Sequence, residues 1–288
     1  MATSEASAGA GPLSTVRTVR RIQPSKGVLL PDLGEMWRFK ELLYYMLWRD
    51  VKARYKQTFL GSSWAILRPA IQTAMQTLIF NQLAGIKQPH YMLFAYAGNL
   101  AWGYFASCFS GGAASMASSG GLISKAYFPR LFVPLASVLA PLVDFVLGLP
   151  VLIFFYIYFG VGPSWAMLTT PLFLLLIMLI GLGIAFWLAP ITVRYRDISF
   201  TLPFILSVWF YATPVVYSVE QFKERIGYGW VLELNPLSGV IEWFRWSLGV
   251  SAAPSFSSLV PSIVIMLVLV STGLLNFRRA ERTLVDVM

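Results

Sequence analysis

The chain has 288 residues, of which 57% are hydrophobic and only 12% are charged. Soluble domains have about 25% charged residues, so this composition excludes an ordinary soluble domain and indicates an integral membrane protein. The net charge of +9 does not indicate nucleic-acid binding, because the basic residues gather near the ends of apolar segments, where they meet lipid headgroups or fix topology.

The first part of the chain is predicted to lie outside the membrane. Residues 1–31 lack the apolar core of a signal peptide, and we expect a flexible cytoplasmic tail. Residues 32–58 are predicted to form an amphipathic helix at the membrane interface, with Asp32 as a suitable N-cap, and then a basic entrance to the first span. The charged run at 49–56 gives way to an apolar helix, which is typical of the cytoplasmic end of a first span.

Residues 59–288 are predicted to form an all-α transmembrane domain of six helices. We expect spans at residues 60–83, 91–117, 131–159, 165–189, 200–217 and 259–277, of which the first is close to the ~20 residues that cross a bilayer. Most lysine and arginine residues then fall on the side that holds both termini. The positive-inside rule therefore predicts that both termini are cytoplasmic.

The segment 219–257, between the fifth and sixth spans, is polar enough to leave the membrane, although it contains several tryptophans. We expect two short outer helices there, interfacial or re-entrant. Asn235 and Pro236 suit the start of one of them, as an N-cap followed by proline. In this helix Glu242 and Arg245 are expected on the side opposite an apolar stripe.

Polar residues within the spans are candidates for function. Arg68, Gln72 and Gln76 recur every four residues and share one helical face, which either lines a channel or bonds neighbouring helices. Asp144 is the only acidic residue deep in a span, so it is a functional candidate that is either neutral or paired with a basic group such as Arg68.

Small residues and prolines predict how the spans pack. Two stripes of small residues allow close helix approach, Ser107, Gly111, Ser115 and Ser119 in the second span and Gly181, Ala185 and Ala189 in the fourth. In the third span, Pro134, Pro141 and Pro150 predict a kink or a break.

The chain lacks the residues of several common chemistries. It has no G-x-x-x-x-G-K-[ST] phosphate loop and no G-x-S-x-G motif. The one cysteine, Cys108, excludes a disulfide framework, and the one histidine, His90, argues against a zinc site, which needs several ligands. We therefore expect no catalytic residues, metal or cofactor on this chain, and a transport pathway whose energy source lies elsewhere.

Five motifs, in order along the chain, resemble those of the ABC-2 type permeases that export lipid-linked polysaccharides such as O-antigen, capsule and teichoic acid. The motifs are RDVKARYKQTFLGSSWAILRP at 49–69, KAYFPR at 125–130, VRYRDI at 193–198, ATPVVYS at 212–218 and NPLSGVIEWFR at 235–245. The resemblance extends from about residue 35 to the C-terminus and does not include the N-terminal tail.

This resemblance implies a set of partners. Two copies of the chain would form the pathway in a bacterial inner membrane, and each would bind a separate ABC ATPase subunit that holds ATP and Mg²⁺. The interface helix and the segment 123–130 would face that ATPase. The substrate would be a polyprenyl-pyrophosphate-linked glycan, beside membrane lipid, and no nucleic acid is expected.

The resemblance also implies roles for particular residues. The first and fifth spans would line the route, and aromatic rings suit a sugar chain because they stack on the apolar face of a pyranose. The candidate channel residues are Trp64, Arg68, Gln72, Gln76, Trp209, Tyr211 and Tyr217; the rings could equally belong to an interfacial aromatic belt. The candidate pyrophosphate entrance is Arg54 and Lys56. The candidate ATPase-coupling residues are Ile123, Lys125, Phe128 and Arg130. The candidate outer gate is Trp230, Trp243, Phe244 and Trp246.

Two other functions remain open on the sequence. The first is export of drugs or small lipids on the same fold, which would show drug-stimulated ATPase activity without a glycan defect. The second is an intramembrane transferase acting on polyprenyl lipids, which would need no ATPase partner.

Overall fold

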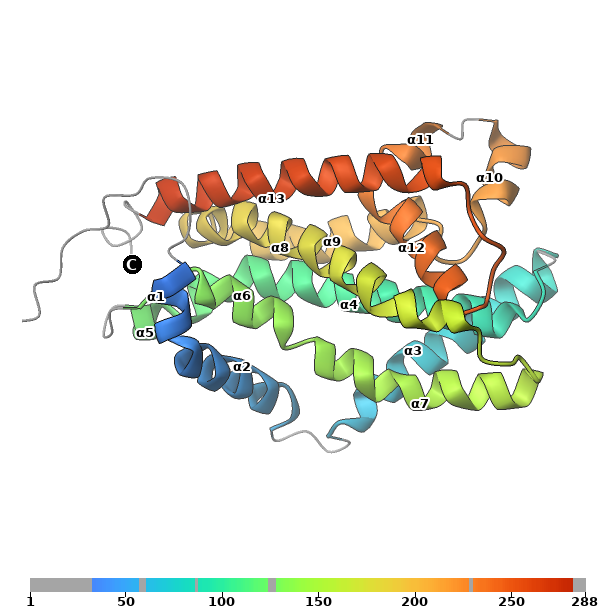
Figure 1. Cartoon of the computed structure of the whole chain (residues 1–288), viewed down its shortest axis with the longest axis horizontal. Coiled ribbons are helices and arrows are strands. Elements are labelled where there is room, and N and C mark those ends of the chain that lie inside the picture. The colour runs from blue at the N-terminus through green and yellow to red at the C-terminus, as the bar shows by residue number, and fades with distance from the viewer. Residues whose placement is uncertain (1–32, 57–60, 86–87, 124–127, 228–229, 282–288) are drawn as a thin grey trace, which may run out of the picture. The chain divides into compact units, whose positions relative to one another are not determined.

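A computed structural model describes residues 33–56, 61–85, 88–123, 128–227 and 230–281 (Figure 1). Every regular element in this part of the chain is a helix, as predicted. The predicted tail, the N-cap Asp32 and the coupling residue Lys125 lie outside the described residues.

The elements follow one another without long connections. They are α1 (Leu33–Arg38), α2 (Lys40–Tyr55), α3 (Ser63–Gln76), the π-helix η1 (Thr77–Leu83), α4 (Tyr91–Ser118), α5 (Gly120–Ile123), α6 (Phe132–Leu139), α7 (Leu142–Phe159), the 3-10 helix η2 (Trp165–Thr169), α8 (Thr170–Arg194), α9 (Asp197–Ala212), α10 (Val219–Ile226), α11 (Trp230–Glu233), α12 (Pro236–Ser247), the 3-10 turn η3 (Phe256–Ser258) and α13 (Leu259–Glu281).

Three helical stretches in the described residues are long and apolar enough to cross a membrane: Phe132–Phe159, Trp165–Arg194 and Phe256–Glu281. They correspond to the third, fourth and sixth predicted spans, whereas α9, in the fifth, is apolar but shorter. The first two predicted spans fall at α3 with η1 and at α4. Both segments are rich in small and polar residues, so their apolar composition alone does not identify them as membrane spans.

The interface segment is helical where predicted but in two pieces, α1 and α2, which are separated at Phe39. The charged run after residue 48 continues α2 as far as Tyr55. Met46 and Val51 are buried, and α2 packs against α6. Its other side exposes Tyr44 and Tyr45.

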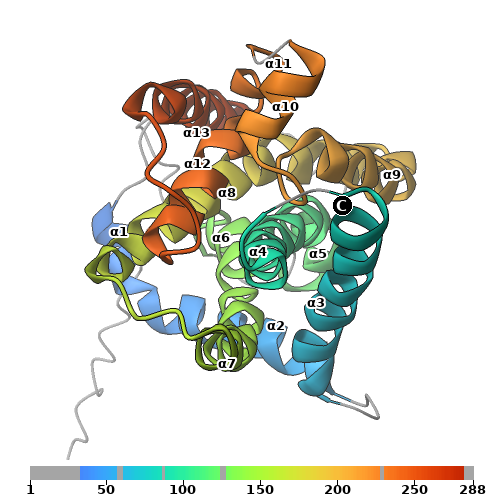
Figure 2. The ribbon, with the colours of Figure 1, turned by 90° about the vertical axis from the view of Figure 1, so that its right-hand side faces the viewer.

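Helix α4 lies at the centre of the helical bundle. It contacts α3, α6, α7, α8, α9 and α12, and Figure 2 shows it end-on among them. Most of its side chains are buried, including Asn99. Because protein covers α4 on several sides, its small and polar residues meet other helices rather than lipid.

Helices α4 and α8 approach closely through small residues. A Cβ atom at Gly112 would collide with Ala185, and one at Gly181 would lie 2.7 Å from the Cβ atom of Cys108. The predicted edge on α8 is therefore confirmed at Gly181 and Ala185. On α4, Cys108 and Gly112 make this contact, whereas Gly111 of the predicted stripe allows a close approach to α6, where its Cβ would lie 3.4 Å from the carbonyl oxygen of Ser137.

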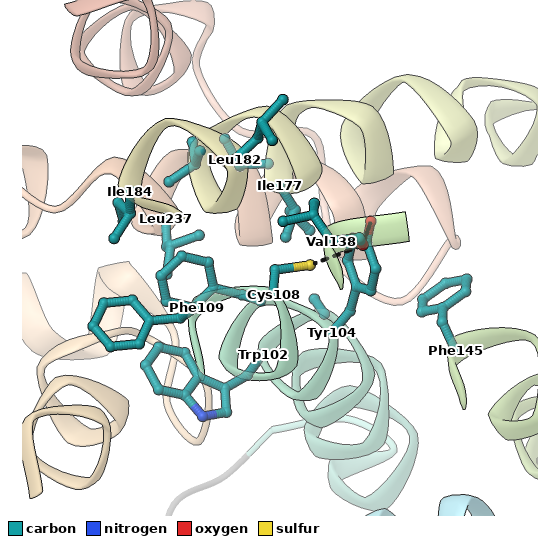
Figure 3. Close-up of a cluster of buried hydrophobic side chains, with 14 of the residues drawn as sticks. Trp102, Tyr104, Cys108, Phe109, Val138, Phe145, Ile177, Leu182, Ile184 and Leu237 are labelled. Atoms are coloured by element: carbon teal, nitrogen blue, oxygen red, sulfur yellow. Dashed lines mark hydrogen bonds between the residues drawn. The ribbon is translucent and has the colours of Figure 1, made fainter. Parts of the chain in front are cut away.

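The predicted break in the third span occurs between α6 and α7, at Ala140 and Pro141. Proline has no N–H group to continue the helical ladder. The carbonyl of Val138, just before the break, accepts hydrogen bonds from the Tyr104 hydroxyl at 3.2 Å and the Cys108 thiol at 3.4 Å. Both donors come from α4, and Figure 3 shows them beside Val138 in the apolar core.

The outer segment holds α10, α11 and α12, of which α12 packs against α4, α8 and α13. Asn235 is the N-cap of α12, as predicted, because its side chain accepts a hydrogen bond from the N–H of Leu237. The fifth span ends earlier than predicted, since α9 stops at Ala212 and residues 213–216 are extended or turn-like.

The prediction for Arg245 was wrong. Its side chain is only 1% exposed, whereas the sequence indicated a polar outer side. It donates hydrogen bonds to the carbonyls of Pro214 at 2.7 Å, Val215, and Phe94 at 3.3 Å. Its guanidinium carbon also lies 3.7 Å from the centre of the Phe94 ring. Arg245 thus donates to two backbone acceptors in the non-helical segment that follows α9 and to one in α4.

Candidate functional site: a groove between α3 and α9

A groove of about 1100 Å³ lies between α3 and α9, with α4 as its floor. In Figure 2 α3 and α9 both lie to the right of α4, with α9 above α3. The end of α2 and the start of α7 contribute Arg54, Tyr55, Asp144 and Phe145 to the lining. The floor combines small residues of α4, such as Gly103 and Ser107, with larger ones, such as Trp102 and Tyr104.

Most of the predicted channel residues line this groove. They are Trp64, Arg68, Gln72, Gln76 and Tyr211, and the predicted entrance residue Arg54 lies with them. Trp64, at the start of α3, and Tyr211, at the end of α9, both line the groove and are both exposed. Lys56, Trp209 and Tyr217 do not line it.

The side chains of Trp209 and Tyr217 pack and form hydrogen bonds within the protein and do not line the groove. The indole of Trp209 packs edge-on against Phe105 at 5.1 Å between ring centres, and it donates to the side-chain oxygen of Asn235 at 3.1 Å. Tyr217 donates to the carbonyl of Tyr211 at 3.0 Å. Aromatic residues in the fifth span thus either line the groove or contact other parts of the chain, and the sequence did not distinguish these two roles.

The sequence allowed Gln76 either to line a channel or to bond a neighbouring helix, and in the structure its side chain bonds a neighbouring helix. Gln76 and Asn99 exchange hydrogen bonds between their amides, at 2.8 and 3.3 Å, and Asn99 also donates to the Thr73 hydroxyl at 2.8 Å. All three side chains are buried between α3 and α4. By contrast, Arg68 and Gln72 are exposed in the groove and form no ion pair or side-chain hydrogen bond with any residue that the structure describes.

Asp144 pairs with Arg54, and the predicted pairing with Arg68 was wrong. Nη1 of Arg54 lies 2.6 Å from Oδ2 of Asp144, and the hydroxyl of Tyr55 donates to Oδ1. Burial raises the pKa of Tyr55 above its ordinary value, and the hydrogen bond to Asp144 raises it further. Tyr55 therefore stays protonated and remains a donor near neutral pH.

The predicted coupling residues are not equivalent. Phe128 is buried in the apolar core, so its side chain is not free to meet a partner protein. Arg130 donates to the carbonyl of Glu281 at 2.6 Å and so ties the start of α6 to the end of α13. Ile123 ends the short helix α5.

The predicted outer-gate residues also differ in their exposure to solvent. Trp230 on α11 is exposed, whereas Trp243 and Phe244 on α12 are buried. Trp243 stacks on Phe173 of α8 at 5.8 Å. The buried rings anchor α12 to the bundle, because an edge-on or stacked ring pair adds about 0.5–1.5 kcal/mol to the burial of its area.

Sequence reasoning missed two residues of the groove, Tyr55 and Asn99, and misplaced Arg245, which is buried outside the groove. A signal existed for Arg245, since it follows Leu237 and Ile241 at intervals of four and so shares their buried face. No comparable signal marked Asn99, whose partner lies 23 residues away on another helix.

Comparison with known proteins gives a consistent result. The sequence profile of the family described as ABC-2 type transporter matches residues 41–248, more than two thirds of the chain. The chain is also 27% identical, over 249 residues, to the O-antigen export system permease protein RfbA of Myxococcus xanthus, covering 86% of this chain and 96% of that protein. A protein of the same name from Klebsiella pneumoniae is 28% identical over 206 residues, covering 71% of this chain and 79% of that protein.

Proposed function

The chain belongs to the ABC-2 type transporter family, and we propose that it is the membrane-spanning permease subunit of an exporter of lipid-linked polysaccharide of the O-antigen type. The similar proteins from Myxococcus xanthus and Klebsiella pneumoniae are named as O-antigen export permeases, which supports this cargo. The observation that carries the proposal is the groove between α3 and α9. Its lining combines rings, amides and an arginine, which are the groups that a glycan with a phosphate-bearing lipid would need.

In this proposal the groove is one half of the export pathway. The exposed apolar residues of α3 and α9 that border the groove, such as Ile71 and Val208, would meet a second copy of the chain. The six predicted spans would place both termini in the cytoplasm of a bacterium and the outer segment α10–α12 on the other side of the inner membrane. Trp230 would then be the exposed ring of an outer gate.

Energy would come from a separate subunit. This chain has no phosphate loop, and its family implies an ABC ATPase partner in general. We place the contact with that ATPase, which would hold ATP and Mg²⁺, at α1–α2 and at the segment 123–130. Arg130 would carry a movement of this segment to α13 through its bond to Glu281.

The substrate would enter with its pyrophosphate toward the basic end of the groove. Arg54 and Arg68 line the groove and offer planar guanidinium groups that bind phosphate bidentately. Lys56 lies outside the lining and would add positive charge to the approach. The sugar chain would follow along the groove between Trp64 and Tyr211, while the lipid tail stays in the bilayer.

The test is to delete the gene for this chain in its host and to restore it from a plasmid. We expect loss of surface polysaccharide and accumulation of the lipid-linked glycan, with recovery on wild-type expression. Trp64→Ala should restore less than a tenth of export, because a base or sugar ring loses about 1–3 kcal/mol of stacking when an aromatic partner is removed. Trp165→Ala is the matched control, since this tryptophan is 84% exposed and outside the groove.

The alternatives predict different results in the same strain. Unchanged surface polysaccharide together with drug-stimulated ATPase activity of the purified complex would indicate an exporter of drugs or small lipids. Activity of the chain alone on polyprenyl lipids, without any ATPase, would indicate a transferase.

A further inference from the structure

Arg54, the basic residue at the end of the groove, is already bound to an anion of the chain itself. Asp144 uses both carboxylate oxygens on α2, one on Arg54 and the other on Tyr55. Asp144 stands in the first turn of α7. These contacts therefore fasten the last turn of the interface helix α2 to the start of α7.

The pair is placed where a ligand in the groove can reach it. The side chains of Arg54 and Asp144 are 28% and 29% exposed, and both line the groove with Tyr55. A fully buried pair would be held by the large cost of leaving one charge unpaired. A pair with this exposure is worth much less, so another anion can replace the carboxylate.

A pyrophosphate is a better partner for Arg54 than Asp144 is. In the ion pair, the carboxylate of Asp144 is bound by Nη1 of the Arg54 guanidinium. A diphosphate carries more negative charge and more acceptor oxygens, and guanidinium binds phosphate oxygens through two parallel hydrogen bonds. Arg68, which has no ion-pair partner among the described residues, lines the same groove and would add to the attraction.

We propose that Asp144 occupies the place of the substrate's pyrophosphate on Arg54 while the groove is empty, and that an arriving polyprenyl diphosphate displaces it. This inference rests on the proposed function and adds a means of sensing the substrate. Displacement of Asp144 releases α2 from α7, so the interface helix changes position only when the groove is loaded. A ligand shifts such an equilibrium by the difference of its affinities for the two states, and here the freed Arg54 supplies that difference.

The first experiment measures binding of a short polyprenyl diphosphate to the chain in lipid nanodiscs, with the uncharged polyprenol for comparison. Asp144→Asn removes the competing anion, and we expect it to tighten diphosphate binding about tenfold, the size of one charge-assisted hydrogen bond. Arg54→Gln should weaken binding by about the same factor. The double variant should behave as Arg54→Gln alone, because both changes act through one group.

Matched controls alter charge on the same helix without touching the groove. Lys52→Gln and Glu41→Gln remove one positive and one negative charge from exposed positions of α2. If the net charge of α2 does not determine binding, each control should change the affinity for the diphosphate less than twofold. Binding of the polyprenol should be the same in every variant.

The second experiment does not depend on whether Asp144→Asn folds. Spin labels at Ala53→Cys and Val146→Cys, both exposed, report the distance between α2 and α7 in a chain that keeps Arg54, Lys56 and Asp144. The native Cys108 is buried and stays unlabelled. Addition of the diphosphate should lengthen or broaden this distance, and polyprenol should not.

The outcomes separate the two proposals. Diphosphate binding that weakens in Arg54→Gln but is unchanged or weaker in Asp144→Asn would overturn the role of Asp144 and leave the proposed function standing. An unchanged α2–α7 distance on binding would also overturn it. A wild-type chain that binds diphosphate no better than polyprenol would overturn the proposed substrate and, with it, this inference.

Discussion

Arg245 joins three segments that are far apart in the sequence. Its hydrogen bonds reach the carbonyls of Phe94 in α4 and of Pro214 and Val215 after α9. In a protein interior each such carbonyl loses its water and needs another donor. A single cation with several donors is therefore well suited to the point where α9 ends.

Replacing Arg245 by methionine should strongly destabilise the chain. The change keeps an apolar stem but leaves several buried carbonyls without donors, at about 1–3 kcal/mol for each unsatisfied group. We expect a clear fall in the melting temperature of the detergent-solubilised protein. Arg196→Met, at an exposed position, is the control and should melt like wild type. An unchanged melting temperature for Arg245→Met would show that other groups satisfy these carbonyls.

Gly98→Ala should destabilise the protein although alanine favours a helix by about 1 kcal/mol. A Cβ atom at this position would collide with the guanidinium of Arg245 and would lie 2.8 Å from the carbonyl oxygen of Val215. Gly103→Ala, on the same helix with open space around its Cβ position, should melt at or above the wild-type temperature. Equal behaviour of the two alanine variants would contradict this close contact.

At the scale of the helices, α3 is joined to α4 by buried amides. Asn99 contacts both Gln76 and Thr73, so its removal leaves two polar side chains without this partner. We expect Asn99→Ala to lower the free energy of unfolding by about 1–3 kcal/mol. Gln72→Ala, one turn from Gln76 but exposed in the groove, should have little effect on melting. A double-mutant cycle of Asn99 and Gln76 should show strong coupling.

The helices themselves were largely predictable, and their ends and partners less so. Apolar length and proline positions indicated α4, α8, α13 and the break between α6 and α7. The end of α9 at Ala212 agrees with the helix-breaking Pro214 two residues on, but the contact of Arg245 with the carbonyls that follow α9 was not predictable, because Arg245 lies 30 residues from Val215. The π-helix η1 was not predicted from the sequence.

The residues that line the groove could also be predicted only in part. Spacing alone placed Arg68, Gln72 and Gln76 on one face, and the resemblance to a family assigned that face to the pathway. Whether a given polar residue faces the groove or a neighbouring helix depends on contacts across the bundle. Gln76 and Trp209 show this most clearly, because each meets a partner that periodicity cannot identify.

At the scale of the whole molecule, the groove predicts how two copies would meet. Cysteine at Met75 or Val208, beside the groove, should form dimers with a short bifunctional cross-linker in native membranes. Cysteine at Ile157, which is exposed on α7 away from the groove, should not. Cys108 is buried and gives no background. Cross-linking through residue 157 alone would place the pathway on another face.

The joint at Pro141 divides the third predicted span into a short rod, α6, and a longer rod, α7. The start of α6 is tied to α13 through Arg130, and the start of α7 is tied to α2 through Asp144. A straight rod would couple these two ties rigidly. Because the helical ladder is interrupted at the proline, each half has its own anchor, and a displacement of α2 reaches α7 by a route separate from the one that joins α13 to α6.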